Sequence, residues 1–180
     1  MDIIHRSNHL GKFDPTIIEN FLKKLSEKDW NEFTDRQTRF KYHAKTKTIA
    51  AIFPNFKNWP ELHINRYKYA DELLDMIQPI VSVFSQNYNG NFIISAAMFV
   101  LLPENHNVDE HSDVHEYFGC THRVHACISG DYKNQDFMIA GQKIKMNSGD
   151  IIEINNRLPH SVQYFGNTPR INAIIDFLPQ

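Results

Sequence analysis

The chain has 180 residues, which fits one domain, and its 42% hydrophobic and 22% charged residues are ordinary for a globular protein with a core. Its 19 Lys and Arg residues against 21 Asp and Glu residues give a net charge of −2, so we expect no general affinity for nucleic acids or anionic membranes. No apolar run is long enough to cross a bilayer, no secretion signal is visible, and the two cysteines suit a reducing compartment, so we expect a cytoplasmic protein.

Residues 1–90 are predicted to be mainly helical. Asp14 and Pro15 are a helix start signal, because Asp caps the first turn and Pro at the first helical position loses no hydrogen bond. We expect Pro54 to end a strand and Pro79 to kink or split a helix. The predicted elements are a helix over 14–30, a strand over 48–53 and a helix over 67–84.

Residues 91–180 are predicted to form short strands separated by turns that contain Gly, Asn and Pro. The expected strands cover 91–102, 123–129, 137–139, 142–146, 150–154, 160–165 and 170–178. Many short strands after helices favour a barrel or sandwich with the helices packed outside. We therefore expect a single domain, 1–180, of the α+β class with a mainly β core, in which 91–180 carries the site.

Period-two alternation places several polar residues on one face of their strand. They are Arg123, His125 and Cys127 on one strand, and Arg170, Asn172 and Asp176 on the other. Polar residues on the inner face of a small barrel are costly unless that face lines a site. A solvated outer face gives the same alternation, so this pattern leaves both interpretations open.

The chain has 10 His residues, a number that invites a search for metal-ligand spacing. His111 and Asp113 are two apart, so in extended backbone both side chains point the same way and can bind one metal ion. This composition produces about one such pair by chance, and a solvated acidic loop is the alternative. His106 and His115 are weaker ligand candidates, because neither has a carboxylate two residues later.

His160 and Arg170 are ten residues apart, with a Gly-Asn-Thr-Pro turn between them. Two strands joined by this turn would place the two side chains on neighbouring antiparallel strands. The alternative is a capping His and a surface Arg. For Arg123 and His125, the alternative to a shared site is an exposed cationic stripe.

Together these residues resemble the iron- and 2-oxoglutarate-dependent dioxygenases. His111, Asp113 and His160 have the order of a 2-His-1-carboxylate triad, which leaves three positions open on Fe(II). Over residues 102–180 the chain resembles the aspartyl/asparaginyl β-hydroxylase family, which includes the free-proline cis-hydroxylases. The residues that carry this resemblance are Arg123-Val124-His125, Gly149-Asp150 eleven residues before His160, Arg170, and Asp176 six residues beyond it.

The resemblance implies a double-stranded β-helix, a cupin-like jelly roll, with the N-terminal helices outside. It implies Fe(II) and 2-oxoglutarate as cofactors. The roles it implies are His111, Asp113 and His160 as metal ligands, Arg170 and His125 in 2-oxoglutarate binding, Arg123 in binding a substrate carboxylate or the cofactor, and Asp176 orienting Arg170. The implied reaction is hydroxylation with release of succinate and CO₂. The carboxylate ligand also argues against halogenation.

The expected substrate is an amino acid or an Asp/Asn-type peptide residue, because Arg123, together with Arg66, suggests a carboxylate partner. The expected partner is thus a small amino acid or short peptide. Five aromatic residues either line the entrance or pack in the core: Trp59, Tyr67, Tyr69, Tyr117 and Phe118. The alternatives are a cupin-like metal-binding module or a non-oxidative metalloenzyme, which need the ligands but not Arg170, and a structural barrel with surface histidines.

Overall fold

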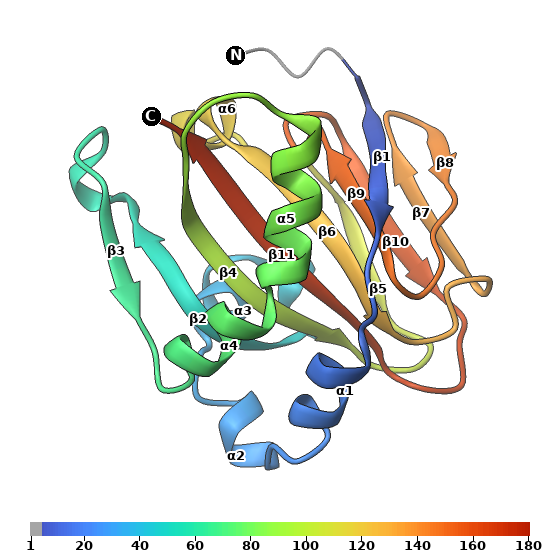
Figure 1. Cartoon of the computed structure of the whole chain (residues 1–180). Coiled ribbons are helices and arrows are strands. Elements are labelled where there is room, and N and C mark those ends of the chain that lie inside the picture. Colours follow the sequence, from blue (N-terminus) through green and yellow to red (C-terminus); the bar gives the residue numbers. More distant parts are fainter. Residues whose placement is uncertain (1–4) are drawn as a thin grey trace.

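The computed structural model describes residues 5–180, and two antiparallel sheets form its core (Figure 1). In spatial order, the seven-stranded sheet contains β1 (Ser7–Lys12), β9 (Asp150–Ile154), β6 (His122–Ser129), β11 (Arg170–Pro179), β4 (Phe92–Leu102), β2 (Lys47–Asn55) and β3 (His63–Arg66). The four-stranded sheet contains β5 (Asn107–His111), β10 (His160–Tyr164), β7 (Gln135–Ile139) and β8 (Gln142–Ile144).

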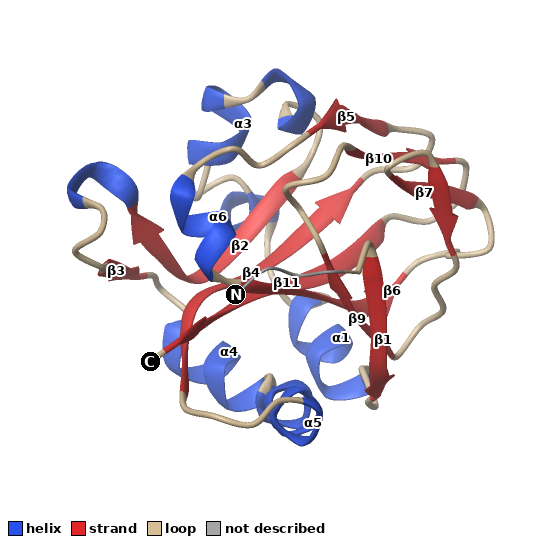
Figure 2. Cartoon of the chain, turned by 90° about the horizontal axis from the view of Figure 1, so that it is seen from above, coloured by secondary structure: helices blue, strands red, loops and turns tan. Residues whose placement is uncertain are grey.

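The helices lie on two sides of the seven-stranded sheet. They are α1 (Thr16–Leu22), α2 (Glu27–Trp30), α3 (Asp35–Arg39), α4 (Ala70–Met76), α5 (Gln78–Asn87) and α6 (Glu116–Cys120), with 3-10 turns η1 (Lys41–His43) and η2 (Phe56–Asn58). Figure 2 shows α1, α4 and α5 against one face, while α3 and the four-stranded sheet lie on the other side. The first half of the chain therefore supplies the outer helices and also part of the opposite side.

The larger apolar core lies between the seven-stranded sheet and the helices α1, α4 and α5. Phe84 of α5 is fully buried, and its ring stacks on Phe177 of β11 with 3.8 Å between ring centroids. Val124 and Ala126 of β6 belong to the same core. A second apolar cluster, which includes Cys127, Phe137 and other buried residues, lies between the two sheets.

Both predicted helices are divided in the structure. The one expected over 14–30 is α1 and α2, because Ser26 starts a new helix: its hydroxyl accepts from the backbone N–H of Asp29, and the Asp29 carboxylate accepts from the backbone N–H of Ser26. The helix expected over 67–84 splits into α4 and α5. Pro79 lies in the first turn of α5, where a missing N–H is tolerated, so the predicted split is confirmed.

The prediction that Pro54 ends the early strand is wrong, because β2 continues to Asn55. Beyond Ile52 the pairing of β2 with β4 stops, and Pro54 pairs only with Ile64 of the edge strand β3. Pro54 therefore lies where β2 has a single neighbour, a position that tolerates a residue without an N–H.

The expectation that His160 and Arg170 lie on neighbouring strands is also wrong. His160 begins β10 of the four-stranded sheet, whereas Arg170 begins β11 of the seven-stranded sheet. The turn between them thus crosses from one sheet to the other. The two side chains nevertheless line one cavity, because the two sheets face each other across it.

Candidate active site

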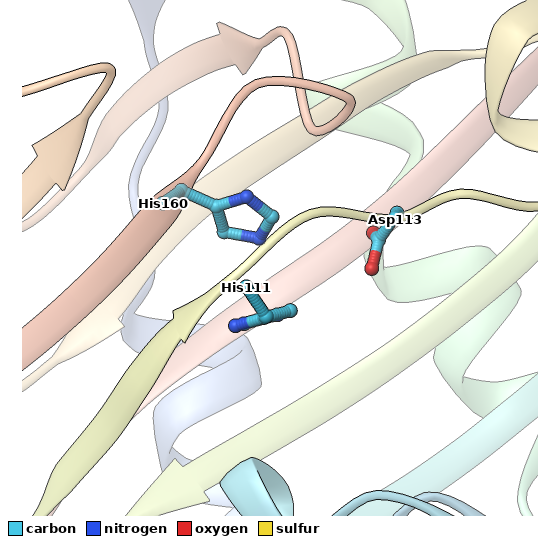
Figure 3. A group of neighbouring side chains, drawn as sticks. All are labelled: His111, Asp113 and His160. Atoms are coloured by element: carbon cyan, nitrogen blue, oxygen red, sulfur yellow. The ribbon is translucent and has the colours of Figure 1, made fainter.

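Two histidines and one aspartate form a potential metal site at the end of the four-stranded sheet. His111 ends β5, Asp113 follows in the next loop, and His160 begins β10, where it pairs directly with His111. Their ligand atoms lie within 4.8 Å of one another, and Figure 3 shows the three side chains around a common centre. The structure therefore brings together the three residues that the sequence predicts as metal ligands.

The backbone fixes which nitrogen of each imidazole can bind a metal. Nδ1 of His111 lies 2.8 Å from the carbonyl of Asp109, and Nδ1 of His160 lies 2.9 Å from that of Leu158. Because a carbonyl can only accept, each Nδ1 carries the proton and each Nε2 keeps its lone pair for the metal. Burial lowers the pKa of His111 to about 4 and also lowers that of His160, which favours the neutral ligand form.

Asp113 is held as a carboxylate by two donors on the same oxygen. Arg123 Nη1 lies 2.5 Å and Asn156 Nδ2 2.8 Å from Oδ2 of Asp113. Although burial alone would raise it, the charge of Arg123 and the Asn156 amide hold the pKa of Asp113 below its ordinary value. Two neutral imidazoles and one ionised carboxylate are the donor set of the facial triad that binds Fe(II), so the residues fit this metal.

Arg123 makes a two-pronged ion pair with a second carboxylate. Its Nε and Nη2 donate to the two oxygens of Asp176 at 2.7 and 2.8 Å, and the hydroxyl of Tyr117 donates to Asp176 at 3.1 Å. Arg123 is opposite Asp176 in the register of β6 and β11. With Asp113 on its third nitrogen, the Arg123 guanidinium has two carboxylate partners, and its predicted role in substrate binding stays a prediction.

Asp176 therefore orients Arg123, and the expectation that it orients Arg170 is wrong. The two residues do share a strand face, as the alternation predicts. They are six residues apart, however, which corresponds to roughly 20 Å along an extended strand. Parity shows that two residues share a face of a strand, but it does not show how far apart they lie along that strand.

Arg170 lies buried at another part of the same cavity, without an acidic partner among residues 5–180. Its Nη2 donates to the Asn172 carboxamide oxygen at 3.0 Å when that amide is oriented to satisfy its neighbours. The guanidinium also lies over the rings of Tyr132 and Phe137, 5.7 and 5.9 Å from their centroids. Its Nε is buried and has no hydrogen-bond partner in the described chain. An uncompensated, oriented guanidinium of this kind fits a carboxylate ligand.

His125 lies beside Arg170 in the cavity. Its ring stacks against Phe137 with 5.6 Å between centroids, and its Nδ1 is buried without a hydrogen-bond partner in the described part of the chain. Burial, together with the charge of Arg170, lowers the pKa of His125 well below its ordinary value, so the imidazole is neutral. The unsatisfied Nδ1 of His125 and the unpaired guanidinium of Arg170 lie in the same cavity as the metal site. They fit the 2-oxo acid that the resemblance implies.

The cavity has a volume of about 330 Å³ and contains all six predicted site residues on its walls: His111, Asp113, Arg123, His125, His160 and Arg170. This volume is in the range of small-molecule sites. Arg66 is not among the residues that line it; it is exposed and pairs with Asp71. Of the five aromatic residues considered for the entrance, Phe118 lines the cavity, while Tyr117 is buried below it.

Sequence reasoning missed the contribution of α3 and η1. Arg36, Tyr42 and His43 line the cavity, and Tyr42 stacks on the His111 ring with 3.8 Å between centroids. These segments are too short for a periodic apolar pattern, and the contact of η1 with β5 joins residues about seventy positions apart. Only an unusual local density of Arg, Tyr and His could have drawn attention to them.

The model of the aspartyl/asparaginyl β-hydroxylase family matches residues 15–179. The chain belongs to this family. The match includes the N-terminal half, where the sequence motifs carried no resemblance. A search among curated proteins finds no match to the sequence.

Solved structures share the fold at low sequence identity. A 2OG-Fe(II) oxygenase-family oxidoreductase from Burkholderia pseudomallei has a TM-score of 0.63 and 9% identity, over 91% of this chain and 77% of that one. HygX from Streptomyces hygroscopicus, with nickel and 2-oxoglutarate bound, has a TM-score of 0.59 and 10% identity, over 93% and 80%. The viral collagen prolyl hydroxylase of Paramecium Bursaria Chlorella virus-1, in its 2OG complex, has a TM-score of 0.57 and 12% identity, over 98% and 97%.

The predicted double-stranded β-helix is confirmed. The family match makes the chain an enzyme of the 2-oxoglutarate-dependent oxygenase class, with Fe(II) and 2-oxoglutarate as the cofactors of that class. Within residues 5–180, none of the helices has the length and apolar character needed to traverse a bilayer.

Proposed function

We propose that this enzyme is an Fe(II)- and 2-oxoglutarate-dependent hydroxylase of an amino acid or of an Asp/Asn-type peptide residue. It would convert a C–H bond of the substrate to C–OH, with one O₂ and one 2-oxoglutarate consumed and succinate and CO₂ released. One observation carries the proposal: the His111, Asp113 and His160 cluster shares a cavity with Arg170, a buried cation without an acidic partner in the described chain.

We assign the metal to His111, Asp113 and His160. When bound, Fe(II) and 2-oxoglutarate supply the O₂ activation. The protein holds the two imidazoles in their Nδ1-protonated form through backbone carbonyls, and Arg123 with Asn156 keeps Asp113 ionised and oriented. A rigid set of ligands with fixed protonation is the contribution of the chain to this chemistry.

We assign the far carboxylate of 2-oxoglutarate to Arg170 and a positioning contact to His125. The Asn172 oxygen and the two rings hold the Arg170 guanidinium without neutralising it, so its charge is available to a ligand. The neutral His125 can donate or accept a hydrogen bond without adding charge to the site.

For the substrate, a small amino acid or short peptide fits the size of the cavity. Its walls also include apolar residues of β4 and β11, such as Met98, Val100 and Ile174. We further propose that the enzyme works in the cytoplasm, where its two free cysteines, Cys120 and Cys127, stay reduced.

The test is a panel of amino acids and Asp- or Asn-containing peptides, incubated with Fe(II), 2-oxoglutarate and O₂ and scored for succinate release and product mass. We expect at least one compound to gain one oxygen atom in a ratio of one to succinate. Arg170→Ala should raise the KM for 2-oxoglutarate about 10- to 100-fold, because hydrogen bonds to a charged group are lost.

Metal binding provides the control in this test. Arg170→Ala should leave the Kd for Co(II) within about two-fold of wild type, whereas His160→Ala should abolish tight Co(II) binding. Unaltered 2-oxoglutarate binding in Arg170→Ala would favour a metal-binding module or a non-oxidative metalloenzyme over the hydroxylase.

A further inference from the structure

The cavity contains a second arginine without an acidic partner, Arg36 of α3. Its Nη2 lies 2.9 Å from Nε2 of His43, and its Nη1 is buried with no hydrogen-bond partner in the part of the chain that the structure describes. No carboxylate among residues 5–180 forms an ion pair with it. Buried polar groups in folded proteins are normally satisfied, so an arginine left in this state indicates a missing ligand.

The acidic residues of the cavity are all engaged elsewhere. Asp113 is held by Arg123 at the metal site, and Asp176, below the cavity, is held by the same arginine. Asp35, the neighbour of Arg36 in α3, is exposed at the mouth and pairs with Arg39 at 3.5 Å. Within residues 5–180, Arg36 therefore has no ion-pair partner of its own.

His43 orients this charge without cancelling it. A guanidinium can only donate, so Nε2 of His43 accepts the hydrogen bond from Nη2 of Arg36 and carries no proton. Arg170 has the same arrangement, with the neutral Asn172 amide as its acceptor. Arg123 differs from both, because two carboxylates compensate it.

The position of Arg36 places a bound anion close to the metal. The His43 ring contacts the ring of the metal ligand His111 edge to face, with 5.2 Å between centroids. One side chain thus separates Arg36 from the metal-binding group. The cavity therefore contains two oriented guanidinium groups, those of Arg36 and Arg170, and each can bind one anion. The proposed function uses only Arg170, which binds 2-oxoglutarate.

We propose that Arg36 binds a carboxylate of the substrate and so determines which compounds the enzyme accepts. This inference rests on the proposed function, and it replaces Arg123 with Arg36 as the residue that recognises the substrate anion. The guanidinium fork fits the two oxygens of a carboxylate, and its single positive charge balances the single negative charge of that group. The substrate would be a carboxylic acid whose apolar part faces Met98, Val100 and Ile174.

The first test locates anions directly and needs no known substrate. Crystals of the protein, loaded with Zn(II) and 2-oxoglutarate, are soaked in bromide, and anomalous scattering is measured. We expect bromide at the guanidinium of Arg36, 2-oxoglutarate at Arg170, and no bromide at Arg123. Absence of bromide from Arg36, or 2-oxoglutarate bound at Arg36, would overturn the inference.

The same crystals distinguish failure of the inference about Arg36 from failure of the proposed function. If neither Zn(II) nor 2-oxoglutarate binds at the predicted residues, the proposed function fails and the inference falls with it. If both bind as proposed and Arg36 has no anion, the inference alone fails.

The second test uses a substrate found in the panel and its primary amide, which differs only by loss of the negative charge. Binding to the anaerobic Zn(II) and 2-oxoglutarate complex is measured by calorimetry. Wild type should prefer the acid about 10- to 100-fold, Arg36→Gln should remove that preference, and Arg36→Lys should restore part of it. The Kd for 2-oxoglutarate should stay within two-fold in both variants.

Arg39→Gln is the matched control, since Arg39 lies on the same short helix and also lines the cavity, but is exposed and paired with Asp35. It should keep the preference for the acid. An equal loss of preference in Arg39→Gln and Arg36→Gln would indicate general charge in α3 and would contradict a specific site at Arg36.

Discussion

The two faces of the seven-stranded sheet differ in chemistry although the same strands form both. In β6, Val124 and Ala126 point to the helices and lie in the larger apolar core, whereas Arg123 and His125 line the cavity. Because successive side chains of a strand point to opposite faces, one short segment serves both purposes. In this fold, residues of one parity along a strand therefore stabilise the core, and residues of the other parity form the site.

One polar cluster interrupts the apolar face and is satisfied internally. His122 Nδ1 lies 2.5 Å from Oε1 of Glu153, and the hydroxyl of Tyr88 donates to the other oxygen of Glu153. His122 and Glu153 are buried beneath the end of α5. His122 therefore lies on the face of β6 opposite to Arg123 and His125, as the alternation of side chains along a strand requires.

The largest expected effect is the loss of metal binding in His160→Ala, on the cavity side of the sheet. Loss of a ligand should weaken Co(II) binding more than 100-fold, since loss of an outer partner alone costs 10- to 100-fold. The free energy of unfolding of the metal-free protein should change little, because no large apolar group is removed. Calorimetry and urea unfolding measure the two quantities, and His106→Ala, outside the cluster, is the control.

A substitution on the helical side of the sheet should lower stability and leave metal binding unchanged. Phe84→Ala removes a fully buried ring from the stack with Phe177 and should lower the free energy of unfolding by about 3–5 kcal/mol. The folded fraction should still bind Co(II) with wild-type affinity. Phe165→Ala, at a ring that is 54% exposed, should cost less than about 0.5 kcal/mol. Equal losses in urea unfolding would contradict the assignment of Phe84 to the core.

A smaller effect on the cavity side is expected from Asn156→Ala. Asn156 is fully buried and donates to Asp113 at 2.8 Å, so its loss leaves the carboxylate with fewer fixed partners. Co(II) affinity should fall about 10- to 100-fold with the ligands themselves intact. Asn134→Ala, whose amide donates to Asp131 outside the cavity, is the matched control. Unchanged affinity would mean that Arg123 alone orients Asp113.

The sequence predicts the second half well because its signals are local. Alternating apolar residues and Gly-containing turns mark most strands of the sheets, and the His-x-Asp spacing places two ligands on one side of extended backbone. The strands β1, β3 and β5 were missed. They are short, and polar residues fill most of their positions, so the apolar alternation that identifies a strand is absent.

What the sequence could not indicate depends on register and on long-range contact. The pairing of Arg123 with Asp176 follows from the register of β6 and β11, which no local pattern defines. Arg36 reaches the cavity because α3 packs on η1, which in turn contacts β5. Local residue types can therefore indicate a metal site. Which charged groups around that site are paired can be determined only from the tertiary structure.

The smallest expected effect concerns the polar cluster of the helical side, through Tyr88→Phe. Burial, together with the hydrogen bond to Glu153, raises the pKa of Tyr88 to about 12, above its ordinary value of 10. A group with a raised pKa in the folded state stabilises the protein below the unfolded pKa, and this contribution is lost as the pH rises through the folded pKa. Wild type should therefore exceed Tyr88→Phe by about 1 kcal/mol in free energy of unfolding at pH 9, and the difference should shrink between pH 10 and 12.

Urea unfolding of both proteins across this range measures the difference directly, and titration of lysines and other tyrosines largely cancels in it. Co(II) affinity at pH 7 should be the same in both, because Tyr88 lies on the face away from the cavity. A difference that stays constant from pH 9 to 12 would mean that the Tyr88 hydroxyl contributes by packing alone. A change in Co(II) affinity would mean that the two faces of the sheet are coupled. This variant therefore tests whether a substitution on the helical face of β6 and β9 affects metal binding on the cavity face.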